Sequence, residues 1–549
     1  MIINQVTLPS TKEGLRFDWH APLKEDFITN LADRVLKQIQ LSQSSRGITK
    51  EAAKLRQMSQ TTIARHLLSA LYNAHTVINS KATPIPVAVP KDSNLYSEKK
   101  THVLNVPYSF RHFESVYKAL VALTWIKVIK GKQGVAYTRI YASGTLETTF
   151  DNLGLQWFKQ TPNPKEALII LRDRIPLSIF PHKPCSKEKY TKITLETPET
   201  PETLQMADNL YRYNEFLIKH CVAFDLPDSA LSTIAKAMAG DGDKYKHKYL
   251  DFSRVQLRRV FSRGDMSLHG RFYGGWWQSI PSKNKHYRTH ITIDGHRTCE
   301  VDFSSVCLRI VYARKGISID PKEDLYDIGL PEKQGAPGQR RQLVKTYINA
   351  IMNDEEETFR LEKEELRQLG LTHENLHSLV LKRHDPIKKE LIAGIGLKTQ
   401  FIDSRIAETI MLTMMNLGVL VLPIHDSFIV KDTHQKLLEN IMLESFKKIT
   451  GHPGSVDTTL PRLPMYFGYS EEDYSKVPEH LKIQPNVTLV GSGGYGGSGG
   501  SGGSKLIHHK ATKMSLYLNS WRRNQDNYSL SYPWNLNQSP IVPKVSWLA

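Results

Sequence analysis

Hydrophobic and polar positions follow a helical period in some stretches of the chain and the alternation of a strand in others. Each change of period marks the boundary of a predicted helix or strand. Residues 47–75, GITKEAAKLRQMSQTTIARHLLSALYNAH, have helical spacing in two segments that are broken near Met58 and Ser59. Ser59 would then be the N-cap of the second helix. Residues 108–131 predict a helix and the start of a strand, and residues 135–143, after a GKQG turn, predict a second strand.

This order of elements, helices followed by a basic two-stranded hairpin, resembles a winged helix. In that motif one helix enters the DNA major groove while the hairpin touches the backbone. We therefore predict an N-terminal segment at 1–44 and a winged-helix-like DNA-binding domain at 45–150. An ordinary helical domain with a hairpin is the alternative, because only the order of elements supports the motif.

The pattern of residues 151–262 is mostly helical, and it carries no recognisable chemistry. Residues 202–224 and 249–264 are the clearest stretches, and both are rich in Lys, Arg and Tyr. We predict a helical region over this part of the chain.

A change of composition marks a boundary near the C-terminal end. Residues 491–504, GSGGYGGSGGSGGS, form a Gly/Ser linker that cannot pack a core, and we place the whole linker at 481–504. The repeats favour an engineered joint over a natural tether. Residues 505–549 are basic and aromatic, contain three prolines and lack helical periodicity. This tail, or fused peptide, is predicted to become ordered on a peptide or protein partner, or on the main body.

Charge and cysteine content narrow the class of protein. Lys and Arg total 73 against 55 Asp and Glu, a net charge of +18, which indicates a polyanionic partner such as nucleic acid. A basic enzyme without such a partner is the alternative. The chain has neither a signal-like N-terminus nor a membrane-length apolar run, so we expect a cytoplasmic, reducing location. No Cys or His spacing is typical of zinc; the cysteines are Cys185, Cys221, Cys299 and Cys307.

Two apolar stretches carry an aspartate where a core strand would exclude one. Residues 420–430, LVLPIHDSFIV, predict a buried strand with His425 and Asp426 at its centre. Residues 299–313, CEVDFSSVCLRIVYA, predict a strand that ends near Asp302 and a helix that follows it. A buried carboxylate is tolerated when it binds a metal. Two Mg²⁺ ions about 3.5–4 Å apart, held by such carboxylates, catalyse phosphoryl transfer.

Between these stretches, residues 339–353 predict a helix with a polar stripe. Arg341, Lys345 and Asn349 follow at i, i+4 and i+8, and Asn353 lies near the same face. Arg and Lys one turn apart suit the phosphates of a nucleoside triphosphate, and the Lys can protonate a leaving pyrophosphate. A solvated polar face is the alternative for this helix taken alone.

Taken in order, these motifs resemble those of family A DNA polymerases and the single-subunit, bacteriophage-type RNA polymerases. Asp302-Phe303-Ser304, followed by Leu308-Arg309, is similar to the first motif, DYSxxxLR. Arg341 and Lys345 match the Arg-x3-Lys of the fingers helix, and His425-Asp426 matches the third motif. Gly270-Arg271 is similar to the Gly-Arg that contacts template and primer. The resemblance covers roughly residues 250–435.

The resemblance implies an α/β (α+β) right-hand polymerase, with palm and compact fingers at 263–480 and a helical thumb at 151–262. Its partners would be a DNA template-primer and nucleoside triphosphates. Asp302 and Asp426 would hold two Mg²⁺ or Mn²⁺ ions with the Phe303 carbonyl. Five residues would bind the nucleotide: Arg341, Lys345, Cys307, Asn349 and Asn353. Lys345 would also act as the general acid. Arg271 and His425 would bind the template-primer.

The chain departs from the family pattern in ways that keep alternatives open. Cys307 stands where DNA polymerases have a Glu that excludes the ribose 2′-hydroxyl, and where RNA polymerases have a small residue. The Tyr-Gly that closes the fingers motif is absent, with Asn353 near that place, and no proofreading carboxylate set is evident. We expect a DNA polymerase, with a single-subunit RNA polymerase or primase-like enzyme as the alternative. A non-catalytic replication initiator or regulator with a degenerate palm is a second alternative.

Overall fold

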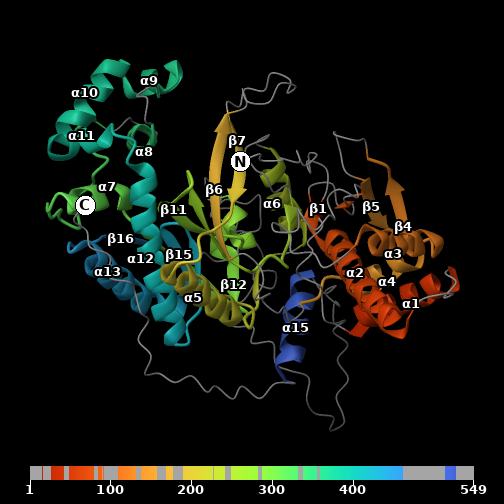
Figure 1. Cartoon of the computed structure of the whole chain (residues 1–549). Helices are drawn as coiled ribbons and strands as arrows, with labels where there is room; N and C mark the ends of the chain where they lie inside the picture. Colours follow the sequence, from red (N-terminus) through yellow and green to blue (C-terminus); the bar gives the residue numbers. More distant parts are fainter. Residues whose placement is uncertain are drawn as a thin grey trace, which may run out of the picture.

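The computed structural model shows a mixed helix and sheet fold (Figure 1), in agreement with the predicted α/β class. The structure describes residues 15–16, 26–42, 49–79, 85–89, 91, 109–131, 138–157, 168–176, 190–224, 226, 228–240, 249–281, 287–331, 338–354, 359–460 and 513–526.

The N-terminal unit has its own core and combines four helices with a small sheet. The sheet has the order β1-β3-β5-β4, and the hairpin expected after the third helix is β4–β5. Buried apolar side chains, among them Leu67, Phe113 and Trp125, fill the space between the helices and this sheet. The winged-helix assignment itself stays a prediction. The elements are β1 (Leu15–Arg16), α1 (Asp26–Ser42), α2 (Lys50–Thr76), β3 (Val87–Val89), α3 (Phe110–Ala122), β4 (Ile126–Ile129), β5 (Thr138–Ala142) and α4 (Gly144–Leu153).

The break predicted near Met58 and Ser59 is wrong, because α2 runs through both residues without interruption. The helix is instead capped by Thr49, whose side chain accepts a hydrogen bond from the Ala52 N–H at 3.2 Å. The Ser59 hydroxyl lies 2.9 Å from Nδ1 of His112 on α3. A tertiary hydrogen bond thus satisfies the side chain that would otherwise favour a cap.

The prediction of a mostly helical region at 151–262 is wrong in part. Its helices are α5 (Pro201–Leu217) and α6 (Asp228–Gly240), but a four-stranded sheet of order β11-β10-β6-β7 also runs through it. Within residues 249–264, two stretches are strands, and Arg259 on the second, only 1% exposed, is paired with Glu408 at 2.7 Å. Periodicity alone does not reveal that long-range partner. The strands are β6 (Ile169–Pro176), β7 (Tyr190–Leu195), β8 (Val222–Phe224), β9 (Tyr249–Leu250), which pairs with β2 (Ile78–Asn79), β10 (Arg258–Ser262) and β11 (Asp265–Tyr273).

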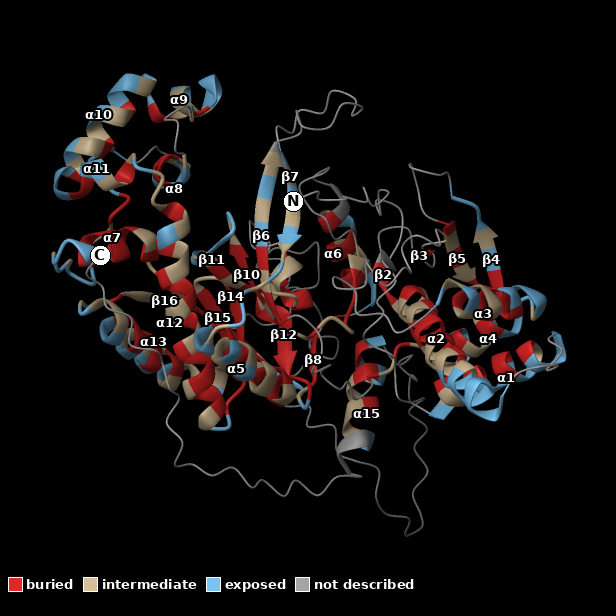
Figure 2. Ribbon diagram, in the orientation of Figure 1, coloured by how far each residue is buried: buried red, intermediate tan, exposed pale blue. Residues whose placement is uncertain are grey.

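A six-stranded sheet forms the centre of the molecule. Its order is β14-β15-β13-β12-β8, and β16 also pairs with β13. Figure 2 shows its strands buried among helices, of which α12 packs on β11, α7 and α13. The remaining elements of this part are β12 (Ile291–Ile293), β13 (His296–Phe303), α7 (Val306–Arg314), α12 (Gly396–Asn416), β14 (Val421–Ile424), β15 (Ser427–Lys431), α13 (Gln435–Thr450) and β16 (Val456–Thr459).

A helical lobe lies beside this sheet and has a separate core that includes Leu308, Val344, Tyr347 and Leu376. Figure 1 shows its helices grouped at one end of the molecule. The lobe contains α8 (Gln339–Asn353), α9 (Lys363–Leu369), α10 (His373–Arg383) and α11 (Lys388–Leu391), and α8 matches the predicted helix 339–353 residue for residue.

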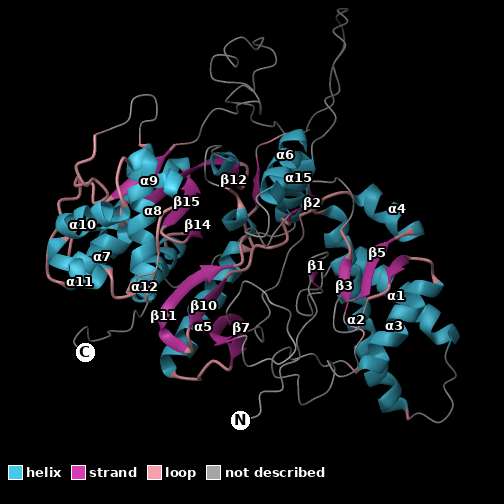
Figure 3. Cartoon of the chain, turned by 90° about the horizontal axis from the view of Figure 1, so that it is seen from above, coloured by secondary structure: helices cyan, strands magenta, loops and turns pink. Residues whose placement is uncertain are grey.

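The sequence of the tail shows no helical periodicity, yet Lys513–Asp526 form the helix α15. Met514 and Tyr517 of this helix are buried in the core that surrounds the central sheet. Ser520 Oγ accepts a hydrogen bond from the Trp157 N–H at 2.6 Å, and Lys513 N–H donates to Asp228 at the start of α6 at 2.9 Å. Figure 3 shows α15 beside α6, so this part of the tail is ordered on the main body.

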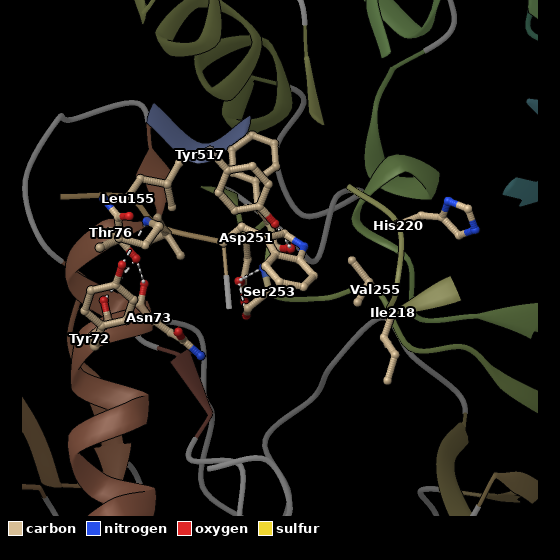
Figure 4. A pocket seen from close by; sticks show the side chains of 14 residues that line it. Tyr72, Asn73, Thr76, Leu155, Ile218, His220, Asp251, Ser253, Val255 and Tyr517 are labelled. Atoms are coloured by element: carbon tan, nitrogen blue, oxygen red, sulfur yellow. Dashed lines mark hydrogen bonds between the residues drawn. The ribbon is translucent and has the colours of Figure 1, made fainter. Parts of the chain in front are cut away.

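A small cavity lies where α15 meets α2, and it is lined by residues 155–157 and 251–253 among others (Figure 4). Its volume is about 30 Å³. A space of that size holds about one water molecule and cannot hold a nucleotide. The cavity is a packing gap between the N-terminal unit, the tail helix and the central core, so the functional site has to be sought elsewhere.

Candidate active site

Residues 420–430 form a hairpin, and not the single strand that their apolar pattern predicts. β14 ends at Ile424, β15 begins at Ser427, and these two residues are paired, so His425 and Asp426 are the two residues of the turn. His425 has a φ of 58°, in the left-handed region that side chains other than glycine rarely adopt. The ionisable pair therefore lies at the tip of a buried hairpin, where its polar groups reach the end of the sheet.

Asp302 lies beside this turn. β13 is antiparallel to β15 in a register that places Asp302 opposite Ser427, and the Phe303 N–H donates to the carbonyl oxygen of Asp426 at 3.1 Å. The predicted strand and helix at 299–313 are present as β13 and α7. Two aspartates that are 124 positions apart in the sequence thus meet at one end of the central sheet.

The charges at this place are poorly compensated. Burial raises the pKa of Asp302 to about 8, Asp426 and Glu300 add to the rise, and Lys345 opposes it. In the part of the chain that the structure describes, neither aspartate side chain takes part in a hydrogen bond or an ion pair. Two carboxylates with free oxygens and excess negative charge fit a hard divalent cation such as Mg²⁺. Over the described ranges, however, no group of three or more His, Cys, Asp or Glu is arranged to hold a metal ion.

Two further carboxylates border the pair, and sequence reasoning missed both. Oε1 of Glu300 accepts hydrogen bonds from Arg288 Nη1 and from Ser427 Oγ, each at 2.7 Å. Asp457 on β16 is paired with Asp302 in register, and its side chain is hydrogen-bonded to Ser304. The alternation of β13 would have indicated Glu300, because residues two apart share a face. No local pattern indicates Asp457, which comes from another strand.

Helix α8 brings two of its cationic side chains to the ring of Tyr326. The guanidinium carbon of Arg341 lies 5.3 Å and the ammonium of Lys345 5.6 Å from the ring centroid of Tyr326. Arg341 also donates through Nη2 to Asp324 at 2.9 Å, an exposed ion pair that an incoming anion could replace. Tyr326 and Asp324 lie in a loop without periodicity, so the sequence did not single them out.

Arg271 approaches the site from β11 but is already paired. It donates to the buried carboxylate of Asp403 on α12, which the sequence analysis did not identify. Burial raises the pKa of the Cys307 thiol to about 11, and Arg271, Asp403 and Asp426 all act on it electrostatically. Cys307 packs against both the core around the central sheet and the core of the helical lobe, and its thiol is neutral at pH 7.

The asparagines predicted on α8 have packing partners of their own. Asn353 donates through Nδ2 to the carbonyl oxygen of Asn349 at 2.7 Å and accepts from Gln400 on α12 at 3.4 Å. A Cβ atom at Gly396 would come within 2.0 Å of Asn353 Oδ1, so only glycine permits this close approach. These contacts join α8 to α12. A nucleotide-binding role of the asparagines stays a prediction.

The His425 side chain carries a buried polar atom that is not hydrogen-bonded within the described residues. Its ring lies 5.2 Å from that of Tyr273 on β11, and its buried Nδ1 has no partner among the described residues. Burial lowers the pKa of His425 to about 4, with Arg271 acting in the same direction. The ring is therefore neutral at pH 7.

Comparisons with known proteins give only weak guidance. No family model and no curated protein matches the chain. Among solved structures it is similar to the POL domain of Pol1 from M. smegmatis in complex with DNA primer-template and dNTP, at 13% identity and a TM-score of 0.27. The match covers 42% of this chain and only 50% of that one. A likeness at this level carries no functional argument. No helix in the described ranges combines the length and the apolar character that a membrane crossing requires.

Proposed function

We propose that the chain is a template-directed nucleotidyltransferase, with DNA synthesis favoured. The observation that carries the proposal is the convergence of four residues from three separate segments. Asp302 and Asp426 meet at the end of the central sheet, and Lys345 of α8 is close enough to act on the charge of Asp302. Arg341 shares the Tyr326 ring with Lys345. In this proposal the central sheet is the palm and the helical lobe is a compact fingers domain.

Each residue has a role that its chemistry permits. Asp302 and Asp426, with the Phe303 carbonyl, would hold the divalent cations, which stabilise the attacking and leaving oxygens when they are bound. Arg341 and Lys345 would bind the triphosphate of the incoming nucleotide, and Lys345 would donate a proton to the departing pyrophosphate. His425 would position the primer end, and Arg271 would contact the template-primer backbone in addition to Asp403.

One observation favours RNA synthesis as the second candidate. Cys307, five positions after Asp302 and within the electrostatic influence of Asp426, is a small neutral thiol, and not a Glu that would exclude the ribose 2′-hydroxyl. A single-subunit RNA polymerase or primase-like enzyme would have a small residue at such a place. Comparison of dNTPs with NTPs on DNA and RNA templates separates the two candidates.

The test is nucleotide incorporation on a primed template with Mg²⁺. Asp302→Asn and Asp426→Asn are each expected to reduce turnover at least about 100-fold, because the metal ligands are lost, while template binding persists. Asp208→Asn on the exposed face of α5 is the matched control, with unchanged turnover expected. Near-normal incorporation by either site variant would refute the assignment. Template binding without any incorporation by the parent protein would favour a replication initiator or regulator.

A further inference from the structure

The strands β6 and β7 form a two-stranded ribbon with one strongly basic face. Their antiparallel register pairs Arg172 with Thr194 and Arg174 with Lys192, and in antiparallel strands directly paired residues share a face. All four of these side chains are exposed, and Tyr190, 47% exposed, continues the row. We call this set of five residues the ribbon face. Figures 1 and 2 show the ribbon extending beyond the sheet, with its outer part exposed.

None of the five residues of the ribbon face is acidic. Arg174 lies directly opposite Lys192, and like charges at such a pair destabilise a sheet. The acidic residue in the described parts of these two strands, Asp173, is one position out of phase and therefore on the other face. Its Oδ1 accepts from the Arg174 backbone N–H at 2.7 Å. Exposed basic side chains aligned along one face are suited to an anionic partner.

The ribbon face continues the surface that borders the aspartate site. β6 is parallel to β10, which is antiparallel to β11, and the register aligns Ile170, Val260 and Arg271 across the three strands. Alternation then places Arg172, two positions beyond Ile170, on the face that carries Arg271. Tyr273 lies on this same face of β11 and contacts the ring of His425.

Electrostatics agree with this alignment. Burial raises the pKa of Tyr273, and the positive charges of Arg271 and Arg172 oppose the rise. Burial lowers the pKa of His269, also on β11, and Lys192 and Arg172 are among the cations that lower it further. Charges on the ribbon therefore affect the pKa values of residues that border the hairpin turn.

We propose that the ribbon face binds the phosphate backbone of a nucleic acid that runs from the aspartate site along the sheet β11-β10-β6-β7. Side chains two apart on a strand are spaced by about 7 Å, so the two arginines can contact separate phosphates. Guanidinium groups bind phosphate in bidentate fashion, and an exposed aromatic ring can contact a sugar or base. The identification of this nucleic acid as a primed template rests on the proposed function; the backbone contact does not.

The test is the salt dependence of binding to a fluorescently labelled primer-template duplex with a single-stranded overhang. Each phosphate contact contributes about 0.9 to the slope of log affinity against log salt for duplex DNA. The full-length triple variant Arg172→Ala, Arg174→Ala, Lys192→Ala is therefore expected to lose about 2 to 3 from that slope. Its melting temperature should not fall, because the like-charge pair on the ribbon is removed. An unchanged slope would overturn the proposal.

A control of equal charge separates this site from the general basicity of the chain. Lys436→Ala, Lys447→Ala and Lys448→Ala remove three exposed lysines from α13 and should leave the slope within about 0.5 of the parent value. An equal loss in this control would overturn the proposal. A second variant, Arg172→Lys with Arg174→Lys, keeps the charge and should keep most of the slope.

Two further readouts define the partner and keep this proposal separate from catalysis. Poly-glutamate at equal charge concentration should compete far less well than duplex DNA; equal competition would identify an acidic polypeptide as the partner and refute the nucleic-acid assignment. Binding is measured in the Asp302→Asn background as well. If the triple variant loses the salt slope but the parent protein shows no incorporation, only the proposed polymerase activity is refuted. If the parent protein incorporates nucleotides normally but the triple variant keeps the full slope, only the ribbon site is refuted.

Discussion

Arg271 donates two hydrogen bonds to a single oxygen of Asp403, from Nε at 2.9 Å and from Nη2 at 2.7 Å. The carboxylate is buried on α12, whereas the arginine is on β11, so this pair ties the two elements together next to the hairpin turn. Burial raises the pKa of Asp403 to about 6, although Arg271 opposes the rise. The arginine that the sequence assigns to the template is therefore also the counter-ion of a buried carboxylate.

Arg271→Ala should consequently destabilise the protein, apart from any effect on template binding. Removal of one partner of a buried ion pair leaves an uncompensated charge and costs about 3–5 kcal/mol. In the Asp403→Asn background the same change should cost less than about 1.5 kcal/mol, since no buried charge remains. Urea unfolding of the two single variants and of the double variant measures the coupling energy.

Equal costs of Arg271→Ala in the two backgrounds would contradict a dominant role of the ion pair. Template affinity in the Asp403→Asn background then gives the separate contribution of Arg271 to nucleic-acid binding. If that affinity is unchanged by Arg271→Ala, the predicted template contact is wrong.

The sequence singled out Asp302 and Asp426, but it did not predict the hairpin turn that carries Asp426. The period of 339–353 predicted α8 because a one-sided polar helix repeats within its own span. The hairpin at 420–430 was not predicted, because its two-residue turn, formed by His425 and Asp426, lacks the glycine that usually marks such a turn. Asp457, Tyr326 and Asp403 were missed because their contacts are with residues distant in sequence.

Longer-range pairing explains the other differences. Residues 249–264 resemble a helix in composition, yet Arg259 finds Glu408 and the strand partners of β10 only after the chain has folded. The helix α15 was not predicted because its apolar residues are few. Tertiary burial of Met514 and Tyr517, and not periodicity, specifies it.

The stability of the metal-free protein should fall as pH rises through the raised pKa of Asp302. The folded pKa is about 8 and the unfolded value about 3.9, so between these the folded state binds more protons than the unfolded state. The free energy of unfolding therefore decreases from about pH 4 to about pH 8, by at most about 5–6 kcal/mol. Asp302→Asn should remove most of this slope, whereas Asp208→Asn should not.

Mg²⁺ provides the complementary measurement for the same carboxylates. A bound cation favours the ionised form, so added Mg²⁺ should raise the free energy of unfolding more at pH 8 than at pH 5. Chemical denaturation at both pH values, with and without the ion, gives the difference. A gain that Asp302→Asn leaves intact would place the ion elsewhere.

The tail helix α15 should contribute to global stability through its buried face. Tyr517 is 5% exposed, its ring lies 5.8 Å from that of Phe252, and its hydroxyl donates to the Phe252 carbonyl at 3.4 Å. Tyr517→Ala should lower the free energy of unfolding by about 3 kcal/mol. Leu516→Ala, at a neighbouring position that is 39% exposed, should change it by less than about 0.5 kcal/mol. Equal effects would show that α15 does not pack as described.

Sugar selection is the property that Cys307 should control. The thiol is uncharged at pH 8, because burial raises its pKa to about 11, and it lies near Asp403 and Asp426. Cys307→Glu would add a third carboxylate to this cluster, so the variant should lose incorporation of both dNTPs and NTPs and is a poor test of side-chain bulk.

Cys307→Gln adds bulk similar to that of Glu without its charge and should sharpen selection for dNTPs, while Cys307→Gly should relax this selection. Bulk alone discriminates by about 1–3 kcal/mol, roughly 10- to 200-fold in the ratio of kcat/KM values. Identical dNTP-to-NTP ratios in the parent, Cys307→Gln and Cys307→Gly would show that another side chain selects the sugar.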